Sequence, residues 1–320
     1  MVELQSIGTW WMWIGFGVFV LAMLAVDLFL LGRNKAHKVT FREALIWSLV
    51  WFALAMIFGG ALWGWLDHTA GREVADAKVV EYLTGYLLEK TLAMDNIFVF
   101  VMIFSYFAVP LEFQKRVLVY GVLGAIIMRA VLILLGAWLI AQFHWVLYIF
   151  GAFLLITGIK MLLFADHQPD LSKNPLLKWL RKHVRITDNY HGDKFWIYDK
   201  GVRWFTPMFL VLVLIEASDL IFAVDSIPAI FAVTQDPFIV FTSNIFAILG
   251  LRALYFLLAD MAERFHLLKY GLAVVLMFVG IKMLIVDWFK IPVEVSLGVI
   301  IAVLGTSMLL SLRASAGKQT

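Results

Sequence analysis

The sequence of 320 residues contains no cysteine and few charged residues. The missing cysteine excludes a disulfide framework, a thiolate metal site, an iron–sulfur centre and dithiol redox chemistry by this chain alone. Charged residues make up 15% of the chain, against about 25% in a typical soluble domain. Hydrophobic residues make up 63%, which is more apolar surface than one soluble globule can bury. These figures exclude an ordinary soluble enzyme, a disordered chain and a nucleic-acid binder, and they indicate an integral membrane protein.

A membrane-crossing helix needs about 20 mostly apolar residues. The chain has about nine apolar runs near that length, which predicts an all-α polytopic membrane protein. A β-barrel would need segments of alternating polarity, whereas these runs are apolar on every face. The predicted spans are 10–31, 43–66, 79–107, 117–143, 145–164, 205–233, 237–259, 267–287 and 292–312.

Basic residues gather in the connections on one side of these spans, which predicts that this side faces the cytoplasm. The richest connection is 165–204, whereas the opposite side, which includes 67–78, has only Arg72, Lys78 and Lys290. We therefore expect the N-terminus outside and the C-terminus in the cytoplasm. The first run lacks a basic n-region and a cleavage pattern of small residues, so we interpret it as a retained span.

Two halves of the chain share landmarks in the same order. The matching pairs are Glu89 and Asp219, Asp95 and Asp225, Arg129 and Arg252, and the Gly-Ile-Lys-Met-Leu stretches from Gly158 and from Gly280. Each unit holds three spans, so the two units enter the membrane from opposite sides and the repeat is inverted. Inverted repeats are typical of secondary transporters, whose substrate site lies where the repeats meet. The expected units are 1–78 (two N-terminal spans), 79–164 (first repeat), 165–204 (cytoplasmic basic loop), 205–287 (second repeat) and 288–320 (last span and tail).

The 165–204 segment is the only sizeable soluble stretch. Its basic amphipathic part, from Leu176 to Val184, is expected to contact lipid and to set orientation rather than to form a binding site. Its end alternates around a turn signal at Asp199-Lys-Gly, which predicts a short β-hairpin.

Charges within the apolar spans are costly, because one charge at the bilayer centre costs about 2.5–3.5 kcal/mol even on a lenient scale. One interpretation is that the acids and bases only neutralise one another. Lys160 and Lys282 lie near span ends and are expected to reach the surface, and Asp27 is expected to be an exposed anchor. Arg129 and Arg252 lie mid-span and are expected to pair with acids, as site support or as structural partners.

A cation site explains the remaining acids better. Pro228 cannot donate to the carbonyl of Val224, so we expect the helix to loosen beside Asp225 and to free oxygen ligands. Carboxylate, amide and hydroxyl oxygens without Cys or His suit Mn²⁺, Mg²⁺ or Ca²⁺. The candidate metal ligands are Glu89, Asp95, Glu216, Asp219 and Asp225, with Asn96, Ser226, Arg129 and Arg252 as auxiliary residues. An empty cluster of carboxylates is expected to hold protons and to release them when a cation binds.

Long motifs around these residues resemble the TerC family of membrane proteins, and in particular its Alx-like branch. They are TGYLLEKTLAMDNIF (84–98), YGVLGA (120–125), EASDLIFAVDSIPA (216–229) and TSNIFAILGLR (242–252). The resemblance implies a bacterial inner-membrane protein related to LysE-type exporters and associated with manganese efflux, metal supply to exported proteins and tellurite resistance. It narrows the expected cargo to Mn²⁺ and places the family's acidic motifs on Glu89, Asp95, Glu216, Asp219 and Asp225. Glu216 has no acidic counterpart in the first repeat, where Tyr86 stands.

We therefore expect a transporter rather than an enzyme, with the lipid bilayer, a divalent cation and protons as partners. No permanent cofactor and no nucleic-acid partner are expected, and the sequence leaves the oligomeric state open. One alternative is an intramembrane aspartyl protease, but its Gly-x-Gly-Asp pattern is absent. Another is a stress-response or tellurite-resistance scaffold that acts through 165–204, although tellurite chemistry by this chain alone is disfavoured without cysteine.

Overall fold

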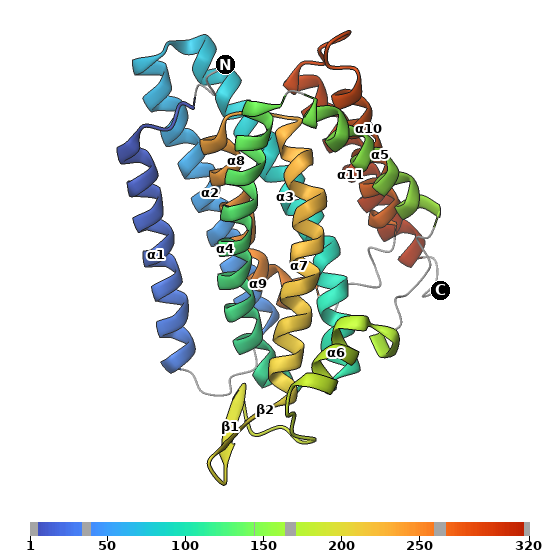
Figure 1. The fold of residues 1–320 in the computed structure, drawn as a ribbon. Coiled ribbons are helices and arrows are strands. Elements are labelled where there is room, and N and C mark those ends of the chain that lie inside the picture. The colour runs from blue at the N-terminus through green and yellow to red at the C-terminus, as the bar shows by residue number, and fades with distance from the viewer. Residues whose placement is uncertain (1–5, 34–39, 144, 164–170, 259–266, 317–320) are drawn as a thin grey trace.

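The computed structural model describes residues 6–33, 40–143, 145–163, 171–258 and 267–316 and confirms an all-α membrane protein. Long helices lie side by side, with a short helix and a hairpin at one end and the N-terminus at the other (Figure 1). We call these the hairpin end and the N-terminal end. The elements are α1 (Trp10–Arg33), α2 (Phe41–Thr69), α3 (Arg72–Tyr106), α4 (Leu111–Gln142), α5 (Val146–Leu163), η1 (Leu171–Lys173), α6 (Pro175–His183), β1 (Trp196–Asp199), β2 (Val202–Phe205), α7 (Pro207–Phe231), α8 (Pro237–Leu249), α9 (Leu251–Leu258), α10 (Leu268–Leu284) and α11 (Val293–Ala316).

Each predicted span coincides with one helix, except that 237–259 is the pair α8 and α9, bent by 42° at Gly250. Within the described residues, five helices are long and apolar enough to cross a membrane, and the bent pair makes a sixth. α3 is not among them because Glu89, Lys90 and Asp95 interrupt its apolar run, and α10 has only 17 residues. The number of nine spans therefore stays a prediction.

The connection predicted at 67–78 is shorter than expected, because only two residues separate α2 from α3. Arg72 forms ion pairs with Asp67 of α2 and with Asp76 one turn along α3, both at 3.6 Å. Its guanidinium also covers the Trp63 ring, 4.3 Å from the ring centroid. Polar contacts thus extend both helices beyond the apolar runs that hydropathy detects.

The segment after α5 is folded at the hairpin end. β1 and β2 pair antiparallel, which confirms the predicted hairpin. Lys200 and Gly201 have positive φ values of 48° and 76°, as a two-residue type I′ turn requires. Leu177 and Leu180 of α6 are buried in one cluster with Met208 of α7. The described part of the segment, 171–206, therefore shares a core with the ends of the long helices.

Helix contacts agree with an inverted repeat. α3 of the first repeat packs on α8 of the second, and α7 of the second packs on α4 of the first. Because α3 corresponds to α7 and α4 to α8, each of these contacts becomes the other when the repeats are exchanged. α5 and α10 approach closely at small residues: a Cβ at Gly151 would lie 3.0 Å from the Gly280 carbonyl oxygen, and one at Gly158 would lie 2.8 Å from that of Ala273. The shift in numbering that aligns Gly158 with Gly280 also aligns Gly151 with Ala273, so the repeat relates these two close contacts to each other. These contacts support the repeat, which remains an inference from the sequence.

Residues 6–9, the N-terminal strap, are tied to the start of α8. The Ser6 hydroxyl and the Ile7 N–H donate to the two carboxylate oxygens of Asp236, at 3.1 and 2.9 Å. Asp236 also caps α8 by accepting from the Phe238 N–H at 3.0 Å. Gly8 lies so close to Phe238 that a Cβ there would stand 2.7 Å from the Phe238 Cβ.

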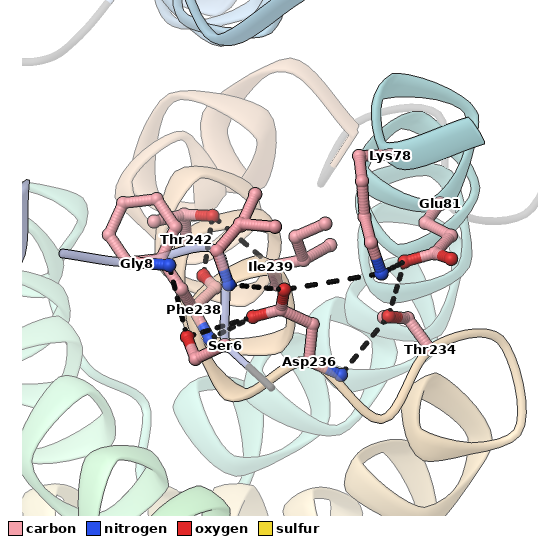
Figure 2. Close-up of polar contacts among 10 residues, drawn as sticks. Ser6, Gly8, Lys78, Glu81, Thr234, Asp236, Phe238, Ile239 and Thr242 are labelled. Carbon is pink, nitrogen blue, oxygen red and sulfur yellow. Dashed lines mark hydrogen bonds and ion pairs between the residues drawn. The ribbon is translucent and has the colours of Figure 1, made fainter. Parts of the chain in front are cut away.

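A second set of polar contacts joins this cap to α3 (Figure 2). The Lys78 ammonium lies 4.0 Å from Asp236 and 2.8 Å from Glu81, and Glu81 accepts from the Thr234 hydroxyl at 2.5 Å. The strap, α3 and the connection from α7 to α8 are thereby joined at the N-terminal end. The N-terminus and the segment 67–78, which contains the start of α3, were predicted to lie outside the cell, and the structure places the strap and the start of α3 at the same end of the bundle (Figure 1).

Candidate functional site

A single guanidinium joins the two repeats in the interior of the bundle. Arg129 of α4 donates to Glu89 of α3 and to both carboxylate oxygens of Asp219 in α7, the latter at 3.3 and 3.0 Å. The exposed fractions of Arg129, Glu89 and Asp219 are 1%, 0% and 2%. A charge-assisted, two-pronged pair of this kind is strong and geometrically specific. One base therefore binds two buried acids, and we call these three residues the central triad.

Two amides extend the central triad. The Asn96 Nδ2 donates to Asp219 at 3.1 Å, and the Asn244 Nδ2 donates to Glu89 at 3.1 Å. Asn96 is fully buried, and its Oδ1 has no hydrogen-bond donor within the described part of the chain. Turning the amide over would set that oxygen against the Asp219 carboxylate, so the hydrogen-bond network fixes its orientation. The site thus contains a buried acceptor oxygen that lacks a donor.

A cavity of about 580 Å³ adjoins the central triad. Its polar lining comes from α3, α4, α5, α7 and α10 and consists of Glu89, Asn96, Arg129, Thr157, Lys160, Asp225, Ser226 and Lys269. Lys160 lies in the last turn of α5 and Lys269 in the first turn of α10, and the chain direction turns both of these helix ends toward the hairpin end. Lys160 is exposed, so the cavity reaches the surface there.

The opposite side of the cavity is closed by apolar packing. Ile227, Ile230 and Phe231, which follow Ser226 along α7 toward the N-terminal end, are all buried in one cluster. The Phe231 ring lies so close to α4 that a Cβ at Gly136 would stand 2.9 Å from it. The described residues therefore show a site that reaches the surface beside Lys160 and is closed by apolar packing toward the N-terminal end.

Asp225 lies in the cavity wall, apart from the central triad. The Thr157 hydroxyl of α5 donates to it at 3.3 Å. The expected loosening of α7 at Pro228 is wrong, because α7 continues through Pro228 to Phe231. A proline removes only one helical hydrogen bond, and the buried turn around it stays packed. The helix break lies instead at Gly250, between α8 and α9.

The remaining predicted residues lie around this centre. Ser226 accepts from Arg129 at 3.3 Å, whereas the Glu216 carboxylate packs against Gly124 of α4 and does not line the cavity. Arg252 is buried and lines a separate small cavity together with Asp219. The side chains of Asp27 and Asp95 lie outside the described residues. Among the side chains that are described, no three of Asp, Glu and His converge on one point that could hold a metal.

The structure adds to or corrects the sequence expectations at three residues. Lys282 does not reach the surface, because it is buried and donates to Ser296 at 2.9 Å. Lys160 is exposed as expected, but it also lines the cavity. Asn244 was not predicted as a site residue. The available signal was the run of three polar residues, Thr242 to Asn244, within the apolar span.

Comparisons with known proteins relate the chain to membrane proteins along almost its whole length. Residues 74–319 match the family described as "Integral membrane protein TerC family". A protein of Escherichia coli K12 named "Putative membrane-bound redox modulator Alx" is 58% identical over 301 residues, 94% of each chain. One of the same name from Photorhabdus laumondii is 52% identical over 317 residues, 99% of each chain. "Uncharacterized membrane protein STKORF319" of Myxococcus xanthus is 48% identical over 312 residues, 98% of this chain and 95% of its own. No solved structure matches.

Proposed function

Since this chain belongs to the TerC family of integral membrane proteins, we propose that it is a transporter that exports a divalent cation, Mn²⁺ first among the candidates, in exchange for protons. The proposal places the protein in the bacterial inner membrane, with the hairpin end in the cytoplasm. It treats the cation as cargo rather than as a bound cofactor, and it assigns the chain no enzymatic reaction.

The observation that carries the proposal is the unpaired Oδ1 of Asn96 beside the cavity. A buried acceptor without a donor is costly, and a hard cation with oxygen ligands would satisfy it. The Asp225 carboxylate and the Ser226 hydroxyl line the same cavity and supply further oxygens. A cation that enters from the hairpin end meets these groups before the closed apolar layer, which is the direction that export requires.

The central triad supports a coupling to protons. Two buried acids share one base, and Asp225 adds a third carboxylate at the cavity. Carboxylates that hold protons when the site is empty must release them when a divalent cation binds. We therefore expect the apparent affinity for Mn²⁺ to fall as the pH is lowered.

Purified protein in liposomes tests the proposal with Mn²⁺ as the only cargo. We expect Mn²⁺ flux to move protons the opposite way, as an interior pH dye reports, and to be accelerated by an imposed pH gradient. Asp225→Asn should abolish this flux, whereas Asp188→Asn, which alters an exposed carboxylate of the 171–206 segment, should not. Mn²⁺ flux without proton movement would contradict the exchange, and no Mn²⁺ flux at all would contradict manganese transport.

The name of the Alx relatives refers to redox modulation. This chain contains no cysteine and therefore offers no thiol–disulfide couple of its own. We propose that any redox effect of this protein is indirect and follows from the supply of a redox-active metal. Deletion of the gene should then change the redox state of cells only while manganese is present, and this change should disappear when manganese is removed from the medium.

A further inference from the structure

The break between α8 and α9 leaves a helix end inside the bundle. α8 ends at Leu249 and α9 begins at Leu251, and α8 is buried along nearly its whole length. The last carbonyl groups of a helix have no partner within that helix and carry partial negative charge. At membrane depth no bulk water is present to satisfy them. A buried helix end of this kind needs a donor from another element.

Lys90 of α3 provides that donor. Its Nζ donates to the Ala247 carbonyl oxygen in the last turn of α8, at 3.2 Å. Gly250 fits between Lys90 and Trp51 of α2: a Cβ there would lie 2.5 Å from the Lys90 Nζ and 3.2 Å from the Trp51 Cβ. The absence of a side chain at position 250 is therefore what lets the ammonium group approach the helix end.

Lys90 and its neighbour Glu89 hold the same half-helix from two sides. Glu89 accepts from Asn244, three residues before Ala247 on α8. Asn244 in turn accepts from Arg129 at 3.4 Å, so the position of α8 decides where one amide of the site stands. In transporters with broken helices, the C-terminal ends of half-helices coordinate transported cations. Here an ammonium group already occupies that place.

We propose that Lys90 is a positioning residue, which binds the C-terminal end of α8 and thereby holds Asn244 against the central triad. The effect of Lys90 on transport rests on the proposed function. When Asn244 is displaced, Glu89 of the site loses a hydrogen-bond donor. It also assigns the cation to the cavity side of the central triad, since the end of α8 is occupied.

A pair of cysteines reports the position of α8 without any transport measurement. A Cβ at Gly85 of α3 would lie 3.4 Å from the Ser243 Cβ of α8, which is close to disulfide geometry. The unaltered chain contains no cysteine, so only the introduced pair can cross-link. We expect Gly85→Cys/Ser243→Cys to cross-link readily, and we expect Lys90→Met to slow the reaction about tenfold, since a hydrogen bond to a charged group is lost. Lys282→Met is the matched control, because Lys282 binds Ser296 of α11 and not α8.

Position 250 provides a second test. Gly250→Ala should slow cross-linking in the otherwise unchanged protein, because the new Cβ meets the Lys90 Nζ. In a Lys90→Ala background the space is free, and the same substitution should have a much smaller effect. Equal damage in both backgrounds, or wild-type cross-linking in Lys90→Met, would overturn the proposal.

The transport assay then separates this role from the proposed function. We expect Lys90→Met to raise the KM for Mn²⁺ about tenfold and to leave the maximal rate unchanged, with Lys282→Met at wild-type values. An unchanged KM together with slowed cross-linking would overturn the functional part of the proposal. If the unaltered protein transports no Mn²⁺, the proposed function fails, while the cross-linking result still decides whether Lys90 positions α8.

Discussion

Glu89 and Asp219 stand at matching positions of the two halves of the chain, and both bind the guanidinium of Arg129. The two acids come from α3 and α7, which pack against each other, and the base comes from α4. The halves are therefore joined at their interface by a buried electrostatic contact, and changes to it should affect both stability and transport.

Replacement of Arg129 by Met should leave two buried carboxylates without their base. Breaking a buried ion pair by removing one partner costs about 3–5 kcal/mol, so we expect a clear loss of thermal stability. The temperature at which the detergent-solubilised protein loses its monodisperse elution measures this loss. Arg129→Lys keeps the charge and should lose less stability, because only the two-pronged geometry is lost. Unchanged stability of Arg129→Met would show that the central triad does not hold the halves together.

Asp225→Asn should separate function from stability. The carboxylate lies in the cavity wall and is only partly buried, so the amide should fit in its place with little change in thermal stability. Loss of one negative oxygen ligand should nevertheless abolish manganese tolerance in cells. Thr157→Val is the control, since it removes only the hydrogen bond at 3.3 Å. Full protection by Asp225→Asn would show that this acid is not a cation ligand.

The absence of cysteine makes the topology easy to test. Single cysteines at Glu73 near the N-terminal end and at Lys182 near the hairpin end occupy exposed positions. A membrane-impermeant thiol reagent should label Glu73→Cys in intact cells and Lys182→Cys only after lysis. The opposite pattern would invert the predicted orientation, and with it the direction of access to the cavity.

Gly8→Ala should loosen the N-terminal strap. The added Cβ would stand 2.7 Å from the Phe238 Cβ, and overpacking of this kind costs about 1–3 kcal/mol. We expect faster hydrogen exchange at the first turn of α8, where the Phe238 N–H donates to Asp236. Gly17→Ala is the matched control, because a Cβ at that position meets no other atom within 4 Å. Equal exchange in the two variants would show that the strap does not hold the cap.

Tyr190→Phe should weaken the attachment of the 171–206 segment. The Tyr190 hydroxyl donates to the Phe107 carbonyl oxygen at 2.7 Å, so its removal should cost about 1 kcal/mol and increase limited proteolysis of the segment. Burial raises the pKa of the Tyr190 phenol. Its stabilising contribution is therefore complete below the unfolded value of about 10 and is lost as the pH rises through the higher folded value.

An absorbance titration of tyrosinate checks the second part of this prediction. The difference between wild type and Tyr190→Phe should show one phenol that ionises above the ordinary range. A difference curve centred at the ordinary value would contradict the burial of this group.

The positions of the long helices could be predicted from apolar runs, and the hairpin from its turn residues. The extension of α3 to Arg72 could not, because it depends on contacts with Asp67 and Trp63 across a turn. The acids of the site were visible because charge is rare in apolar spans, and the same reasoning indicated Arg129 as their partner. Which acids it binds depends on how α3, α4 and α7 pack, and the sequence alone does not contain that information.

Two features escaped the sequence for different physical reasons. The break in the predicted span 237–259 was missed because Gly250 is an ordinary residue in a membrane helix, and only Lys90 and Trp51 on either side reveal why it is needed. Pro228 is the reverse case, in which a strong local signal for a break is overridden by the packing of a buried turn. In both cases tertiary contacts decide the outcome.

The contact between Ser6 and Asp236 spans 230 positions of the chain, and this bears on how the protein is assembled. During synthesis the N-terminal strap is made long before its partner carboxylate, which appears only when the second repeat is well under way. Until then the strap and α1 cannot contact α8, because a nascent chain that stops before Pro237 does not contain that helix. The strap is therefore made early and is among the last segments to reach its final place.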